Sequence, residues 1–191
     1  MARLGLYYLL GRSRKNMFDR EKFKSLVHYV CWSCEDPTVL GSVKLNKVLY
    51  KADFAAYYRD SSITGEEYVK RQYGPVPKHI VPILRELAEN GDVAIRDAEH
   101  FGYDKKEFFA ITKPDLSRFT AEEISIVDEM ILYVCYQHTA RSISKELHDE
   151  VWELAEIGEE IPYVTAFSRP GEITEMDIEW ARMKIEEFQG A

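Results

Sequence analysis

The chain has 191 residues, with 25 Lys or Arg, 33 Asp or Glu and a formal net charge of −8. This length allows a single domain with a sizeable hydrophobic core. No apolar run approaches the ~18 residues that a membrane-spanning helix needs, which excludes an integral membrane protein. A net acidic chain also argues against a general nucleic-acid binder, because binding to phosphates depends chiefly on Lys and Arg.

The charge is unevenly distributed along the chain. Residues 1–60 carry a net charge of +5, residues 61–118 carry −1, and residues 119–191 carry −12. Such asymmetry indicates interaction surfaces of opposite sign and says little about the fold. We therefore expect the acidic C-terminal region to contribute affinity for a basic partner.

The first predicted helix runs from Asp19, a favourable N-cap, to about Cys34, and is closed by Asp36-Pro37. Its two cysteines, Cys31 and Cys34, have the C-x-x-C spacing of redox and zinc sites, but no further ligands and no preceding strand are evident. Because the apolar residues around them follow helical spacing, we interpret both as core residues. With Cys135 they form an odd set, which indicates reduced thiols in a cytoplasmic protein.

A second helix is predicted from Ser42 to about Arg59, with its apolar residues on one face. Three lysines, Lys44, Lys47 and Lys51, fall on another side of it. This lysine stripe has two interpretations: a solvated helix face, or part of the docking site of an acidic partner.

Residues 61–77 are predicted to be non-helical, with strand-like residues at 68–73. Gly74 suggests a position that needs a positive φ or a close backbone approach, and the extended Pro75-Val76-Pro77 feeds a helix at 77–89. The segment either presents Tyr73 to a partner or forms a buried turn that orients this helix. Asn90-Gly91 ends the helix, and a hairpin with strands at 93–95 and 108–111 follows.

The C-terminal part is predicted to be helical. Thr120 and Glu123 form a capping box that opens a helix to about Gln137, and shorter helices are expected at 142–147 and 150–157. A final acidic amphipathic helix should run from Thr174 through Phe188. The fold class is therefore mainly α with a small antiparallel β hairpin or sheet (α+β), in a single globular domain.

Three motifs in order resemble the Panacea antitoxin domain, the SocA-like or GepA-like phage-associated family. The first is KLNKVLYKAD at 44–53. The second comprises ITGEEY at 63–68 and YGPVP at 73–77. The third is SKELHDEVW at 144–152, followed by GEEIPY at 158–163. Each motif alone is weak, but their order over about residues 22–167 makes the resemblance specific.

The resemblance implies a Panacea domain at 19–167, flanked by an N-terminal extension at 1–18 and an acidic C-terminal helix at 168–191. It further implies a protein-binding antitoxin of a toxin–antitoxin system in bacteria or their prophages. The expected partner is a cognate protein toxin encoded by the adjacent gene. SocA itself resembles an adaptor that delivers its toxin to a protease, so a protease is a further expected partner. No catalytic residue, cofactor or metal is expected, and no membrane partner.

Candidate partner-binding residues come from the three motifs. They are Lys44, Lys47, Lys51, Tyr73, Gly74, Pro75, Val76, Pro77, His148, Asp149 and Trp152. The neighbouring His148 and Asp149 suggest acid–base chemistry, but adjacent helical residues point about 100° apart and cannot easily pair. We therefore expect Asp149 to cap a short helix and His148 to be a hydrogen-bonded packing residue.

Two other functions fit parts of the sequence. A winged-helix regulator that binds operator DNA would place Arg71, Lys78, His79 and Arg85 near its second helix, although this middle segment has a net charge of only −1. A metal-dependent or hydrolytic enzyme is the third hypothesis. The five histidines of the chain, at 28, 79, 100, 138 and 148, lack the spacing of a metal site.

Overall fold

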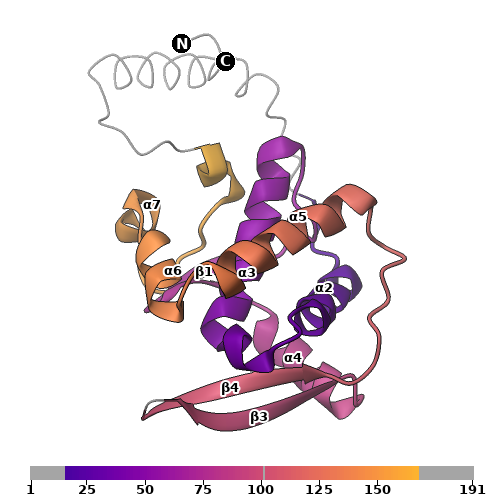
Figure 1. Cartoon of the computed structure of the whole chain (residues 1–191). Helices are drawn as coiled ribbons and strands as arrows, with labels where there is room; N and C mark the ends of the chain where they lie inside the picture. The colour runs from indigo at the N-terminus through magenta and orange to yellow at the C-terminus, as the bar shows by residue number, and fades with distance from the viewer. Residues whose placement is uncertain (1–15, 101, 168–191) are drawn as a thin grey trace, which may run out of the picture.

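The computed structural model describes residues 16–100 and 102–167 of the chain. Helix α3 (Pro37–Arg59) lies at its centre, with α2 (Arg20–Ser33) and α5 (Ala121–Ile131) packed against it (Figure 1). Two separate antiparallel sheets of two strands each complete the described fold. The predicted class, mainly α with a small β element in one domain, is confirmed.

Side-chain caps begin both of the first two helices. The Asp19 carboxylate accepts a hydrogen bond from the Lys22 amide at 2.9 Å, as predicted for an N-cap. Asp36 accepts one from the Thr38 amide at 2.8 Å, with Pro37 in the first turn of α3. Asp36-Pro37 therefore starts a helical segment as well as following α2. Gly41 (φ 58°) bends α3, so its straight part begins near the predicted Ser42.

The segment after α3 forms a β-hairpin of strands β1 (Tyr68–Arg71) and β2 (Gly74–Pro77). A later segment covers the other edge of β1: the Lys70 amide donates to the Glu159 carbonyl at 2.9 Å, and the Ile161 amide donates to the Tyr68 carbonyl at 2.8 Å. Strand character at 68–73 and an extended 75–77 were predicted, but their pairing was not. Pro77 belongs to β2, so the next helix, α4 (Ile80–Glu89), begins later than predicted.

Beyond α4 the second hairpin has longer strands than predicted. Gly91 (φ 76°) follows the end of α4, which confirms the predicted stop. Strands β3 (Val93–His100) and β4 (Tyr103–Ala110) pair antiparallel over eight residues each. β4 packs against both α2 and α3 at the base of the helices (Figure 1).

The predicted capping box is present at the start of α5, where Thr120 and Glu123 each accept from the other's backbone amide. The predicted continuation to Gln137 is a π-helical turn, η1 (Leu132–Tyr136), which buries Val134 and Cys135. Two short helices, α6 (Ala140–Glu146) and α7 (Glu150–Leu154), precede a 3-10 turn, η2 (Tyr163–Phe167). The predicted acidic helix at 168–191 lies outside the described residues.

The core confirms the interpretation of the C-x-x-C spacing. Cys31, Cys34 and Cys135 are all buried free thiols. Burial raises the pKa of the Cys31 thiol, whereas a hydrogen bond from the Cys135 thiol lowers the pKa of Cys34. Over the part of the chain that the structure describes, no helix combines the length and the apolar character needed to cross a membrane.

Candidate functional site

The three sequence motifs converge on one side of α3. The first lies on α3, the second forms the turn after it and the β1–β2 hairpin, and the third covers α6 and α7. Both α6 and β2 pack against α3, and α6 and α7 lie beside β1 (Figure 1). Segments about 100 residues apart in the chain thus form a single structural unit.

Lys47 is at the centre of this unit and is almost fully buried, with 1% of its surface exposed. Its Nζ donates to the Pro75 carbonyl at 3.1 Å, the one acceptor that it has among the described residues. Burial lowers the pKa of Lys47 to about 7, because charging an ammonium group away from water is unfavourable. The ammonium group is therefore only partly charged near neutral pH.

Gly74 is required where β2 passes Lys47. Its φ is +102°, and a Cβ at this position would lie 2.4 Å from Lys47 Nζ. The predicted need for a positive φ and a close approach is confirmed. Gly74, Pro75 and Pro77 are buried and Val76 is partly buried, so most of the YGPVP string is internal.

The lysine stripe is not a solvated face. Lys44 is buried and donates from Nζ to the Cys135 carbonyl at 2.7 Å, so that interpretation is wrong for both Lys44 and Lys47. Lys51 is partly buried; it pairs with Glu146 at 2.8 Å and lies 4.8 Å from the Tyr133 ring centroid. The three lysines join α3 to the hairpin, to η1 and to α6. The burial and the partners of these lysines depend on packing against distant segments, which the spacing of residues along the helix does not reveal.

A second polar cluster, centred on Asp53, lies one and a half turns further along α3. The fully buried Asp53 carboxylate accepts hydrogen bonds from the Thr64 amide at 3.0 Å, the Thr64 hydroxyl at 2.8 Å and the Tyr68 hydroxyl at 2.7 Å. Burial raises the pKa of Asp53, and these hydrogen bonds oppose that shift. The sequence analysis missed this cluster, although an aspartate four residues after Leu49 on the apolar face of α3 was a signal for it.

Glu66 extends the cluster toward α4. Its Oε1 lies 2.9 Å from His79 Nδ1, its backbone carbonyl accepts from the Tyr163 hydroxyl at 2.7 Å, and its Oε2 is buried without a partner among the described residues. Burial raises the pKa of Glu66. His79 also stacks on Phe18 at 4.4 Å, so the last residue of the predicted N-terminal extension packs against this site.

The third motif stacks two aromatic rings beneath the hairpin. The His148 and Trp152 rings lie 3.7 Å apart and nearly parallel, and Lys70 Nζ is 3.9 Å from the centroid of the Trp152 ring. The Asp149 carboxylate accepts from the Trp152 amide at 2.9 Å, which confirms the predicted cap. His148 packs by stacking, and its Nε2 has no hydrogen-bond partner in the described chain, contrary to the expectation. Burial, with Lys47 and Lys70 nearby, lowers the pKa of His148.

Tyr73 is the exception within the YGPVP string, because 60% of its surface is exposed at the turn of the hairpin. Its backbone is fixed, since its carbonyl accepts from the Ser144 hydroxyl at 3.2 Å and the adjacent Gly74 lies against Lys47. Gly74 to Pro77 therefore form the largely buried turn of one interpretation, whereas the Tyr73 side chain is exposed. Binding of a partner by Tyr73 stays a prediction.

Two of the four basic residues considered for DNA contact pair with acidic side chains, and the other two, Arg71 and Arg85, are exposed on different elements. Lys78 pairs with Glu67 at 2.7 Å, and His79 lies against Glu66. The geometry therefore gives a groove-reading function no specific support.

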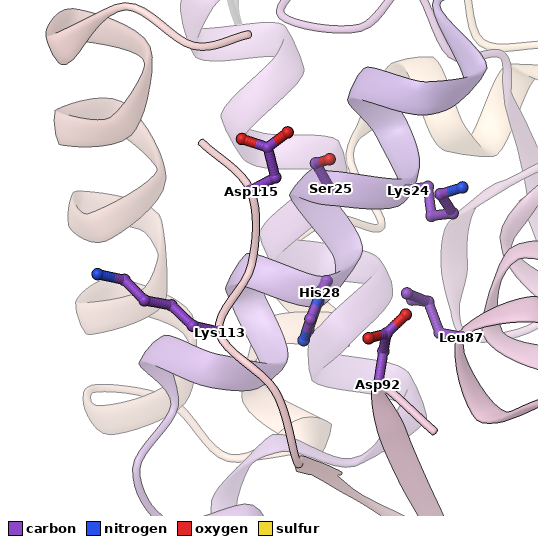
Figure 2. Close-up of a pocket in the computed structure, with 7 residues that line it drawn as sticks. All are labelled: Lys24, Ser25, His28, Leu87, Asp92, Lys113 and Asp115. Atoms are coloured by element: carbon purple, nitrogen blue, oxygen red, sulfur yellow. The ribbon is translucent and has the colours of Figure 1, made fainter. Parts of the chain in front are cut away.

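A small open cavity of about 200 Å³ lies away from the motifs, between α2 and the segments at 87–92 and 113–115. His28 Nε2 lies 2.8 Å from the Thr112 carbonyl, and Asp92 accepts from the Thr112 hydroxyl at 2.6 Å. Figure 2 shows Lys113 pointing away from His28. These polar groups are therefore engaged in hydrogen bonds within the protein. No group of three or more His, Cys, Asp or Glu residues within the described ranges could hold a metal ion.

Comparison with known proteins gives one family. The family model described as "Antitoxin SocA-like, Panacea domain" matches residues 45–153, which is more than half of the chain. The match spans α3 to α7 and so includes both polar clusters and the hairpin. No curated protein and no solved structure matches the chain.

Proposed function

The chain belongs to the SocA-like antitoxin family with a Panacea domain, and from this premise we propose that it binds and neutralises a cognate protein toxin encoded by the adjacent gene. An antitoxin role is the general property for which the family is named. The proposal adds a direct complex between the two proteins, formed in the cytoplasm, where the three described cysteines would remain reduced.

The observation that carries the proposal is the position of Tyr73. The other residues of the hairpin motif are buried or partly buried in a hydrogen-bonded unit, whereas the Tyr73 side chain projects from it. Tyrosine is frequent among residues that dominate protein interfaces, and a rigid backbone reduces the entropy lost on binding. A fixed, exposed aromatic side chain on a conformationally locked turn suits an anchor for a partner protein.

The remaining candidate partner-binding residues take positioning roles in this proposal. The contacts of Lys47 with Gly74 and Pro75 hold the hairpin against α3. The cap that Asp149 gives to the Trp152 amide holds α7 in place beside the hairpin. No catalytic residue, cofactor or metal forms part of the proposed function, and neither does operator DNA.

Co-expression tests the proposal directly. The product of the adjacent gene should arrest growth when expressed alone, and co-expression of this chain should restore growth and give a co-purifying complex. Absence of both rescue and complex would contradict the proposal.

The half-life of the toxin separates two modes of neutralisation. If this chain acts as an adaptor for a protease, the half-life of the toxin should shorten several-fold when the chain is present and return to its original value when the protease is deleted. If the chain acts by masking, the half-life should stay unchanged while growth is restored.

A further inference from the structure

Three strongly exposed apolar side chains lie on two adjoining elements. Tyr73 projects from the β1–β2 turn, and Leu154 and Ile157, which are 86% and 64% exposed, lie at the end of α7 and just after it. Two hydrogen bonds join the elements, both at 2.9 Å: the Lys70 side chain donates from Nζ to the Ala155 carbonyl, and the Gly158 amide donates to the Lys70 carbonyl. We call Tyr73, Glu153, Leu154, Glu156 and Ile157 the hairpin–α7 face.

The hairpin–α7 face has a fixed backbone. The inner side of α7 is held by Trp152, which packs against both His148 and Lys70, and by the Asp149 cap. The loop after α7 is closed by the Glu159 carboxylate, which accepts from the Glu156 amide at 2.6 Å. Exposed apolar side chains on a backbone that is already ordered lose little entropy when a partner covers them.

The charge around these apolar side chains is mainly negative. Residues 149–160 contain six acidic side chains and no Lys or Arg. Lys70 beneath them is buried, and it donates to the backbone carbonyls of Glu153 and Ala155. One basic side chain, Arg71 at the end of β1, lies next to Gly158 at the edge of this acidic segment. An apolar patch with an acidic surround is complementary to an apolar patch with a basic surround.

We propose that the hairpin–α7 face is the docking surface for the toxin, and that the toxin presents Lys and Arg residues around an apolar patch. This inference rests on the proposed function and specifies the face and the chemistry of the contact. The apolar side chains supply the central contact, and Glu153 and Glu156 accelerate association and exclude acidic partners. The sequence alone placed the attraction for a basic partner in the C-terminal region in general, whereas the structure offers a suitable surface on the β1–β2 turn and at the end of α7, within and just after the matched residues 45–153.

Other occupants fit this face less well. A second copy of the chain would bring two acidic surrounds together, which is unfavourable when like charges approach at an interface. Nucleic acid would be repelled for the same reason. Self-association through this face is therefore an alternative outcome of the test.

The test measures binding of the purified product of the adjacent gene to the full-length chain. An apolar variant carries Tyr73→Ser, Leu154→Ser and Ile157→Ser, and a charge variant carries Glu153→Lys and Glu156→Lys. The apolar control is Val81→Ser on α4, which removes a side chain that is 64% exposed. The charge control is Glu99→Lys with Asp104→Lys, an exposed cross-strand pair in the β3–β4 hairpin that undergoes the same charge change.

The apolar variant should weaken binding at least 100-fold and the charge variant at least 10-fold, while both controls stay within 3-fold of the wild type. Binding of the wild type should weaken as salt is raised, and the charge variant should show a smaller salt dependence. Circular dichroism and the midpoint of thermal unfolding check that each variant is folded, and single substitutions replace any multiple variant that is not.

Each outcome has a definite reading. If the wild type binds and the face variants bind equally well, the proposed docking surface is wrong while the proposed function stands. If the wild type does not bind the product of the adjacent gene, the proposed function fails and this inference fails with it. If the wild type forms a dimer that the face variants abolish, the occupant is a second copy and the assignment to the toxin is overturned.

Discussion

Two buried charged residues of α3, Asp53 and Lys47, differ in how completely hydrogen bonds satisfy them. The Asp53 carboxylate receives three hydrogen bonds from Thr64 and Tyr68. Lys47 has three protons to donate and one described acceptor, the Pro75 carbonyl at 3.1 Å. A buried charge stabilises a fold only when hydrogen bonds replace the lost hydration. The Asp53 cluster should therefore fix the fold, whereas Lys47 should be tolerated at a cost.

The largest expected effect is at Asp53. Asp53→Ala leaves the Thr64 amide and hydroxyl without their acceptor in the core and leaves the Tyr68 hydroxyl with the Leu49 carbonyl alone, so the free energy of unfolding should fall by about 3–4 kcal/mol. Urea denaturation measures this. The control is Asp97→Ala, which removes a carboxylate that is 88% exposed and should change stability by at most about 0.5 kcal/mol. Equal losses for the two variants would contradict the difference between the clusters.

A smaller loss is expected where the hairpin passes Lys47. Gly74→Ala would strain a residue with φ +102° and push Lys47 away from Pro75, so the free energy of unfolding should fall by about 2–3 kcal/mol. Gly91→Ala is the matched control, because Gly91 has φ +76° with no atom within 4 Å of the added Cβ. It should lose about 1 kcal/mol from backbone strain alone. If urea denaturation gave both variants the same loss in the free energy of unfolding, the contact of the added Cβ with Lys47 would have no effect on stability.

Lys47→Met tests the incompletely satisfied charge through pH. The pKa of Lys47 is lowered to about 7 in the folded protein, from a usual value of about 10.4 in the unfolded chain. Between these values the unfolded chain binds more protons, so the stability of the wild type should rise with pH relative to the variant. The advantage of Lys47→Met in the free energy of unfolding should shrink by about 2 kcal/mol from pH 7 to pH 9.

Urea denaturation at several pH values gives this difference. Methionine has a similar volume without the charge, so the variant should be folded and at least as stable as the wild type at pH 7. A difference between wild type and variant that is constant from pH 7 to pH 9 would mean that Lys47 keeps its ordinary pKa.

The smallest effect on stability is expected at Tyr73. Because its side chain projects into solvent, Tyr73→Ser should change the free energy of unfolding by at most about 0.5 kcal/mol. Thermal and urea unfolding check this. A loss comparable to that of Gly74→Ala would show that Tyr73 belongs to the scaffold.

Local signals predicted the ends of several elements. The caps at Asp19 and Thr120 and the stop at Gly91 depend on hydrogen bonds or backbone angles within a few residues, and all three are present. Asp149 was predicted on the same basis. Such features are encoded in adjacent residues, so the sequence alone specifies them.

Contacts between distant segments were not predictable in this way. Lys47 has the spacing of a polar helix face, and its burial depends on a carbonyl 28 residues later in the chain. The pairing of β1 with β2 was hidden by Pro75 and Pro77, which lack a donor and normally argue against a strand. The π-helical turn at Leu132–Tyr136 likewise follows from packing, since the sequence continues in a helical pattern.

The family motifs therefore combine two roles, a buried scaffold and a displayed side chain. The most direct test compares growth rescue by Lys47→Met and by Tyr73→Ser, each co-expressed with the product of the adjacent gene at equal levels of folded protein. Rescue should persist with Lys47→Met and be lost with Tyr73→Ser. Loss of rescue with Lys47→Met and full rescue with Tyr73→Ser would contradict the account.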